Sequence, residues 1–544
     1  MKKSVAKRLL CIAMVACMLL VGCGKQGETQ TSEKPADVQE QPAAEGQTEA
    51  AKEKVTFQIA VSKHALCKSD DFNEMEIFKM AEEATGVHID WIYVEDGATE
   101  KLNAMLTADL PDAFLYLVYE NHIASNMDLF MDISPILEEN APHVVADYGK
   151  MQEDGMQRVT WPDGSIRSLM TGLEVSYQND AESILVINKE WLDKLGMEVP
   201  TTIDEMYNVL CAFRDNDMNG NGDPNDEIPL ELTEANWAGK SMNLANSWGI
   251  AAVDSTDSNY YYKLKDGKVN PTIDTQEYRS YLEFMHKLMA ENLMDKEGFT
   301  QTNDQYYAKL KSGNVGMWGA WTPYSVMPEE LASKYVPVRV MQAEEGITPV
   351  KSGRRYKLFA NRTGFAITKD CENPERLLQW WDYLSSSTEI KYTMRYGAKG
   401  GYWDVNEEGK VYQKTPEGLT ADFTVENYKQ TYGMNDKCTL ILKDEDILVS
   451  KEESFTTWVR VNLVDQVWDQ LATEYLPIRF SDPAKVDERT FMETELNEYA
   501  RNFTATSIMD GVDDAKWEAH LKQLKALQYY EWIQWYQDYV DGKF

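Results

Sequence analysis

The chain has 544 residues and a formal net charge of −36 at pH 7. An acidic excess of this size argues against binding to nucleic acid or to anionic lipid, because both depend on basic patches. A chain of this length is expected to form two or more lobes. Its 15 tryptophans and 29 tyrosines are typical of proteins that stack sugar rings.

The first 22 residues carry the pattern of a secretion signal. Four basic residues precede an apolar run at 9–21, which is shorter than the roughly 20 residues that span a membrane. The run ends in Leu20-Val21-Gly22-Cys23, which is typical of a bacterial lipobox, where the signal is cut and the cysteine is lipid-modified. We expect residues 1–22 to be a lipoprotein signal peptide and the lipid on Cys23 to hold the protein at the extracellular face of the cell membrane. The alternative is a plain secretion signal that happens to contain a cysteine.

Residues 23–54 are expected to be the lipid anchor and a disordered tether. They are rich in Gln, Glu, Thr, Ala, Lys and Pro, and contain almost no large apolar side chain. Such a segment cannot bury enough surface to offset the entropy lost on ordering. Folded sequence is therefore expected from Val55 onwards.

Beyond Val55 the hydrophobic pattern predicts strands alternating with helices. The expected strands are residues 55–62, 87–93, 113–119 and 183–187. The expected helices are residues 72–85, 101–108, 189–195, 202–214 and 373–386, with further helices in the last forty residues. Strands that alternate with helices form parallel β–α–β units, so the predicted fold class is α/β.

The segment 215–229, DNDMNGNGDPNDEIP, alternates oxygen-bearing side chains with residues that permit tight turns. A hard cation such as Ca²⁺ takes about six to eight oxygen ligands, and glycines allow the backbone to wrap around it. We predict a structural Ca²⁺ here, and the alternative is an ordinary solvated turn. The candidate ligands are Asp215, Asp217, Asn219, Asn221, Asp223, Asp226 and Glu227.

Two registers of this loop fit a cation. A loop that starts at Asp215 places oxygens and a glycine as in an EF-hand. A loop that starts at Asp217 uses the two asparagines, a carbonyl near Asp223 and the closing pair Asp226 and Glu227.

Three motifs lie together in residues 188–230: Trp191-Leu192-Asp193-Lys194-Leu195-Gly196, Pro200-Thr201-Thr202, and the Asn-Gly-Asn-Gly loop that ends in Asp226-Glu227-Ile228-Pro229. Through these motifs the chain resembles the long extracellular solute-binding lipoproteins (family 1) of Gram-positive bacteria. Those proteins serve carbohydrate ABC importers and are similar to alginate-oligosaccharide-binding proteins. In that family the loop binds structural Ca²⁺, and its first ligand aligns with Asp217. This chain carries about one extra residue before Asp226.

The resemblance implies a type II periplasmic-binding-protein fold: two α/β lobes with a hinge and a central ligand cleft. It would place residues 55–171 and about 322–387 in lobe I, and residues 172–321 and about 388–544, with the C-terminal helices, in lobe II. It also implies a monomeric receptor that closes on an oligosaccharide and delivers it to the permease subunits of an ABC importer.

Candidate cleft residues are aromatic side chains beside glycines and one acidic residue at a strand edge. They are Trp248, Trp318, Trp321, Tyr402, Trp403 and Asp112. The alternative for each aromatic residue is core packing. That alternative is favoured for Trp380 and Trp381, which fall within a predicted helix.

Two other functions stay open. A binding protein for a peptide or another non-sugar solute would have the same fold and differ only in its cleft. A secreted glycan-active enzyme would need a carboxylate pair at a defined separation, and the sequence has no serine nucleophile elbow, phosphate loop or zinc motif. We therefore expect a protein that is not an enzyme.

Four cysteines of the folded part are widely scattered: Cys67, Cys211, Cys371 and Cys438. We expect them to be structural thiols, and the alternative is a disulfide among them.

Overall fold

The computed structural model describes residues 54–95, 98–151, 155–173, 181–251, 260–354, 360–420, 422–442, 447–448 and 455–544. The expected signal peptide, the lipid on Cys23 and almost all of the tether fall outside this part of the chain. Within the described residues, no helix combines the length and the apolar character needed to cross a membrane.

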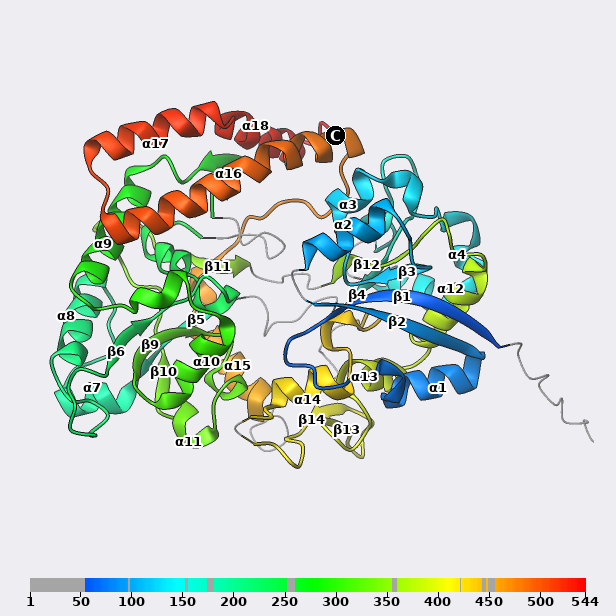
Figure 1. The fold of residues 1–544 in the computed structure, drawn as a ribbon, viewed down its shortest axis with the longest axis horizontal. Coiled ribbons are helices and arrows are strands. Elements are labelled where there is room, and N and C mark those ends of the chain that lie inside the picture. Colours follow the sequence, from blue (N-terminus) through cyan, green and yellow to red (C-terminus); the bar gives the residue numbers. More distant parts are fainter. Residues whose placement is uncertain are drawn as a thin grey trace, which may run out of the picture. The chain divides into compact units, whose positions relative to one another are not determined.

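The first of two main sheets has the strand order β2-β1-β3-β12-β4 (Figure 1). Its strands are β1 (Val55–Lys63), β2 (Val87–Glu95), β3 (Ala113–Leu115), β4 (Leu169–Thr171) and β12 (Asn361–Ile367). β1 pairs in parallel with both β2 and β3, and β12 returns antiparallel to β3. The helices α1 (Glu76–Thr85) and α2 (Thr99–Thr107) make the connections. The predicted parallel β–α–β units are thus confirmed.

A core of large aromatic side chains fixes helices onto this sheet. Phe365 of β12 stacks on Trp381 of α12 (Pro374–Tyr383) with ring centroids 4.2 Å apart, and Phe78 of α1 stacks on Trp380. Both tryptophans are buried, as predicted for this helix. The smaller helices around the sheet are α3 (Glu120–Ala124), α4 (Ser134–Asn140), α5 (Pro142–Lys150) and α6 (Gly155–Val159).

The segment after α12 belongs to the same core. Tyr392, Trp403 and Cys438 are buried in one cluster with Phe78 and Trp381. The elements of this segment are α13 (Thr388–Tyr396), β13 (Trp403–Val405), β14 (Val411–Gln413), α14 (Val425–Tyr432) and β15 (Ile447–Leu448). We call this core with its sheet the first lobe. The expectation that everything after residue 387 lies in the second lobe is therefore wrong for residues 388–441.

The second main sheet has the order β10-β5-β9-β6. Its strands are β5 (Ile184–Asn188), β6 (Ile228–Glu231), β9 (Val315–Ala320) and β10 (Tyr335–Pro337). β6 is parallel to β9, and β5 is antiparallel to both β9 and β10. Because β10 pairs with β5, the expected return to the first lobe at residue 322 is wrong for residues 322–337. We call this sheet and the helices packed on it the second lobe.

The helices of the second lobe are α7 (Lys189–Leu195), α8 (Ile203–Arg214), α9 (Gln276–Ala290), α10 (Asn303–Ser312), α11 (Glu329–Ala332) and α15 (Phe455–Asp465). Two of them, α7 and α8, begin and end within a residue of the predicted bounds, and the other helices were not predicted. Gly196 ends α7 in the left-handed conformation with φ 67°. Thr202 and Glu205 form the expected capping box of α8. The remaining short strands are β7 (Tyr262–Lys265), β8 (Lys268–Pro271), β11 (Lys351–Arg354) and β16 (Leu471–Ala472).

The last three helices are α16 (Pro483–Asp510), α17 (Asp514–Ala526) and α18 (Tyr529–Val540). The last two lie in the forty residues predicted to be helical, and most of α16 precedes them. Early in α16, Val486 is buried with Phe114 and Phe130 of the first lobe. Farther along, Leu496 and Ala500 join the core of the second lobe, where α16 packs on α9 (Figure 1). One helix therefore contributes to the cores of both lobes.

The four cysteines expected to be thiols are free in the structure. Cys67, Cys371 and Cys438 are buried, and Cys211 is partly buried.

Candidate functional site

Open α/β folds usually bind their ligands at the carboxyl ends of the parallel strands, which share one edge of the sheet. In the second lobe this edge follows β6 and β9, and Trp321 lies directly after β9. Helix α14 of the first lobe contacts the same place, since the Lys429 ammonium lies 5.9 Å from the Trp321 ring centroid. Side chains from both lobes thus meet at this edge, and we take the meeting point as the candidate site.

Trp321 is held by a buried arginine. Arg460 of α15 is fully buried and donates from Nη1 to the Trp321 carbonyl at 2.9 Å, and its guanidinium lies 5.1 Å from the Trp321 ring centroid. Its Nη2 donates to the carbonyl of Ala181 at 2.6 Å. Trp321 itself is half-buried, so the indole is fixed while part of its surface stays accessible.

Glu426 and Lys429 form an ion pair one helical turn apart on α14, with 2.7 Å between Oε2 and Nζ. Their side chains are 23% and 14% exposed. Glu426 Oε1 also accepts hydrogen bonds from Gln430 at 2.8 Å and Asn435 at 3.3 Å. Burial acts to raise the pKa of Glu426, but Lys429 and the hydrogen bonds outweigh it and lower that pKa to about 2. Burial likewise acts to lower the pKa of Lys429, and Glu426 outweighs it, so both groups are charged at neutral pH.

Two polar side chains of the second lobe complete the constellation. Asn236 donates from Nδ2 to the Tyr307 hydroxyl at 2.8 Å. Burial raises the pKa of Tyr307, and the negative charge of nearby Glu426 adds to this effect. Trp237, the residue after Asn236, is 46% exposed.

This arrangement suits the binding of a polyol ring. An indole face can cover the C–H surface of a sugar, while an amide, a phenol and a fixed ion pair can meet its hydroxyl groups. Glu426 is ionised and held by three donors, so it is placed to accept hydrogen bonds and not to deliver a proton. We call the set Trp321, Asn236, Tyr307, Glu426 and Lys429 the two-lobe site.

Of the two candidate tryptophans Trp318 and Trp321, only Trp321 lies at this edge. Trp318 lies inside β9, where every residue is buried, and is 1% exposed with its ring against Tyr335. The expectation of cleft exposure is wrong for Trp318, because β9 is an inner strand and both of its faces are covered.

Three other aromatic candidates are also core residues. Trp403 is fully buried and donates from Nε1 to the carbonyl of Gly397 at 2.7 Å. Tyr402 is buried beside Tyr396, and Trp248 is buried beside Tyr281. Exposure in a cleft is therefore wrong for all three, since other residues of the chain already bury these side chains.

Asp112 lies at the amino end of strand β3 in the first sheet, whereas ligands of this fold class bind at the carboxyl ends of the parallel strands. It precedes β3 and accepts a hydrogen bond from the backbone N–H of Gln58 at 2.7 Å. Burial raises its pKa in spite of this bond. Because parallel strands place their carboxyl ends at the other edge, the expectation that Asp112 lines the cleft is wrong.

The acidic loop connects α8 to β6 and is closed by its own hydrogen bonds. Asp217 accepts from the backbone N–H groups of Gly220 at 2.7 Å and Gly222 at 2.8 Å, and both glycines have positive φ. Glu227 Oε1 accepts from the N–H groups of Met218 at 2.7 Å and Asn219 at 3.2 Å. Glu227 Oε2 is buried and has no hydrogen-bond partner.

The loop geometry favours the register that starts at Asp217. Asp215 points to its neighbour, with Arg214 Nε at 2.7 Å and Nη2 at 3.0 Å from its two oxygens. Asp226, in contrast, faces into the loop and accepts from Asn219 at 3.2 Å and Asn221 at 2.6 Å. Asp223 accepts from the N–H of Asn225 at 3.0 Å.

The fit to a cation is partial in this structure. Among the described residues, no three Asp, Glu, His or Cys side chains converge as metal ligands. The candidate ligand atoms are nevertheless all oxygens, as Ca²⁺ requires. One of them, Glu227 Oε2, is buried without a hydrogen-bond partner. A residue that the sequence did not point to also reaches the loop: Asn314, before β9, donates to Asp226 Oδ2 at 3.0 Å. A bound cation would replace some of these amide contacts.

The fold and the two-lobe site define a protein of the solute-receptor class. The chain belongs to the bacterial extracellular solute-binding protein family, whose model matches residues 70–390. It is 26% identical over 505 residues to the fructooligosaccharide ABC transporter substrate-binding protein FusA of Streptococcus pneumoniae, covering 88% of this chain and 89% of the relative. It is 24% identical over 340 residues to the polygalacturonan/rhamnogalacturonan-binding protein YtcQ of Bacillus subtilis, covering 61% and 64%.

Solved structures show the same fold. FusA in complex with kestose has a TM-score of 0.78 at 22% identity, covering 90% of this chain and 99% of that one. A solute-binding protein of Bifidobacterium longum infantis, described as binding HMO, has a TM-score of 0.76 at 24% identity, covering 90% and 99%. The alginate-binding protein AlgQ2 without calcium ion has a TM-score of 0.69 at 18% identity, covering 91% and 100%. The predicted two-lobe α/β fold and the resemblance to this family are confirmed.

Proposed function

We propose that this protein is an extracellular receptor that captures an oligosaccharide by lobe closure and delivers it to the permease of an ABC importer. Membership of the solute-binding family supports the receptor role. The names of the relatives, which refer to fructooligosaccharide and to polygalacturonan, support a carbohydrate ligand. The observation that carries the proposal is the approach of Lys429 in the first lobe to Trp321 in the second.

Capture works through contacts that need both lobes. A sugar ring would stack on the accessible surface of Trp321 and exchange hydrogen bonds with Asn236 and Tyr307 of the second lobe. The same ligand would meet Glu426 and Lys429 of the first lobe. Contacts that form together only in the closed state shift the population toward closure. The permease would then recognise the closed, loaded receptor.

The proposal includes a structural Ca²⁺ in the acidic loop. Asp217, Asn219, Asn221, Asp226 and Glu227 would hold it, with a carbonyl near Asp223. The ion would supply a fixed positive charge that ties the end of α8 to the start of β6. Asn314 already joins this loop to the turn before β9, so the ion would also steady the strand that leads to Trp321.

The proposal also includes the lipid on Cys23, which would keep a monomeric receptor near its permease at the outer face of the membrane. The tether expected at residues 23–54 would let the folded part reach the transporter. Mass spectrometry of the protein purified from membranes would show a diacylglyceryl-modified Cys23 if this is right. A soluble product cleaved elsewhere would contradict it.

The function is tested by isothermal titration of the folded part, residues 54–544, with Ca²⁺ present. The panel contains neutral oligosaccharides, uronides and short peptides. Saturable binding of one glycan class supports the proposal. Binding of peptides alone would keep the fold and overturn the ligand class, and turnover of a glycan would overturn the binding-only role.

A further inference from the structure

The cations of the two-lobe site already have acceptors in the structure. The Lys429 ammonium lies 2.7 Å from the Glu426 carboxylate. The Arg460 guanidinium is buried and donates to the backbone carbonyls of Trp321 and Ala181. The Lys429 charge is therefore paired with a carboxylate, and the Arg460 Nη groups are turned to backbone carbonyls.

Glu426 cannot readily turn away from Lys429. It lies in the first turn of α14, where Thr424 forms a capping box with Asn427. The hydrogen bonds from Gln430 and Asn435 hold Glu426 Oε1, which leaves Oε2 on the lysine. The helix spacing and these two donors fix the carboxylate beside the ammonium.

A ligand carboxylate at this site would meet a poor partner. It would have to compete with Glu426 for Lys429 and would lie next to a like charge while losing its own water. Like charges brought together at an interface cost binding free energy and exclude the wrong partner. A hydroxyl group avoids this cost, because it can donate to Glu426 and accept from Lys429.

Building on the proposed function, we infer that Glu426 is a specificity residue: by neutralising Lys429, it makes the two-lobe site select uncharged oligosaccharides and reject uronic acids. Glu426 acts by setting the charge of the site and by touching the sugar. The ligand class is thus a neutral glycan.

The test compares a neutral oligosaccharide that binds the wild-type protein with the same sugar after oxidation of its primary alcohols to carboxylates. Wild type should bind the neutral form at least ~10-fold more tightly. Glu426→Gln keeps the shape and one acceptor oxygen but removes the negative charge that pairs with Lys429, so the preference should fall to about 3-fold or less. Adding Lys429→Met to Glu426→Gln should restore the preference, because the ammonium freed by Glu426→Gln is then absent.

A matched control comes from α16. Lys485 and Glu488 have the same spacing and the same 2.7 Å separation, but both side chains are well exposed and lie on a different helix from the site. Glu488→Gln should leave the ~10-fold preference unchanged. Melting curves of all variants report whether each one is folded.

Equal binding of the neutral and oxidised sugars by wild type would overturn the inference without any variant. Retention of the full preference in folded Glu426→Gln would also overturn it, while the proposed function would stand. If wild type binds no glycan, the proposed function fails and this inference fails with it.

Discussion

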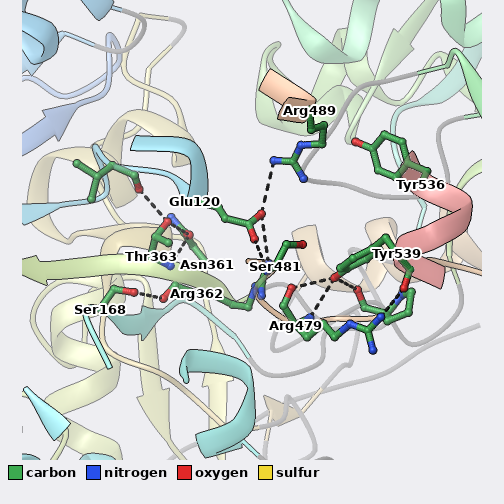
Figure 2. A network of polar contacts seen from close by, with 12 residues as sticks. Glu120, Ser168, Asn361, Arg362, Thr363, Arg479, Ser481, Arg489, Tyr536 and Tyr539 are labelled. Atoms are coloured by element: carbon green, nitrogen blue, oxygen red, sulfur yellow. Dashed lines mark hydrogen bonds and ion pairs between the residues drawn. The ribbon is translucent and has the colours of Figure 1, made fainter. Parts of the chain in front are cut away.

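Glu120 of α3 and Arg489 of α16 form an ion pair, with 3.6 Å between carboxylate Oε2 and Nη2 (Figure 2). The same carboxylate lies 4.0 Å from Arg362 of β12 and accepts a hydrogen bond from the backbone N–H of Ser481 at 3.2 Å. Both Glu120 and Arg489 are only 17% exposed in their side chains. One carboxylate therefore joins the first sheet to the start of the C-terminal helices, whose later turns pack in the second lobe.

Replacing this carboxylate should weaken the folded protein. Glu120→Gln leaves two guanidinium groups without their shared anion in a largely buried place, so the free energy of unfolding should fall by about 1–3 kcal/mol. Urea unfolding at neutral pH measures it. Glu488→Gln, which breaks an exposed pair on α16, should change it by less than ~0.5 kcal/mol. Equal effects of the two substitutions would contradict the bracing role of Glu120.

Trp318 inside β9 and Trp321 directly after it should respond in opposite ways to substitution. Trp321→Ala removes the accessible indole and should abolish measurable glycan binding while the melting temperature stays close to that of wild type. Trp318→Ala leaves a cavity in the core and should cost about 3–5 kcal/mol of stability. Titration calorimetry and urea unfolding of both variants separate the two roles. Normal glycan binding by the Trp321→Ala variant would show that Trp321 does not contact the ligand.

The register of the cation loop can be tested with two neighbouring aspartates. Removing Ca²⁺ from a site that binds only the folded state loses a stabilisation of about 2.7 kcal/mol when the ion was present at 100 times its Kd. A chelator should therefore lower the melting temperature of wild type. Asp217→Ala should abolish this response, and Asp215→Ala should keep it, because Asp215 is paired with Arg214 outside the loop. A melting curve that chelation leaves unchanged would argue against the ion.

Buried His520 should make stability depend on pH. It is 1% exposed, stacks on Phe503 and contacts the carbonyl of Ile273 at 2.7 Å. Burial lowers its pKa to about 4 from 6.5, although the contact with Ile273 acts to raise it. Between these values the unfolded chain binds the proton and the folded chain does not, so stability falls as pH falls through this window.

The size of the His520 effect follows from the two pKa values. Between pH 7 and pH 4, titration of His520 should lower the free energy of unfolding by roughly 3 kcal/mol. The His520→Gln variant has no titrating group at this position, so its free energy of unfolding should fall by roughly 3 kcal/mol less than that of wild type over the same pH range. Urea unfolding at several pH values measures both. Parallel pH profiles for wild type and His520→Gln would contradict a neutral buried histidine.

Local signals in the sequence predicted the elements well. The capping box of Thr202 and Glu205 and the glycine after Leu195 depend on neighbours in the chain, so α7 and α8 begin and end as expected. The strands 55–62 and 87–93 lie within β1 and β2, because a regular alternation of apolar side chains is also a local property.

The site was harder to predict because burial is decided by distant segments. Trp318 and Trp321 lie three residues apart, yet one is covered on both faces and the other lies beyond the strand end. Trp403 is buried by Tyr392, which belongs to another element. Lys429 follows Trp321 by more than a hundred residues, and only the folded chain brings them together. The Asn-Gly-Asn-Gly motif, in contrast, pointed to its loop directly.

In the proposed function the two lobes capture a sugar between Trp321 and the Glu426–Lys429 pair. Isothermal titration of wild type and of the folded Trp321→Ala variant, against the same panel of oligosaccharides and peptides, tests it most directly. We expect saturable binding of an oligosaccharide by wild type and loss of that binding in Trp321→Ala. Wild-type protein that binds peptides and no oligosaccharide, or a variant that binds the sugar unchanged, would contradict it.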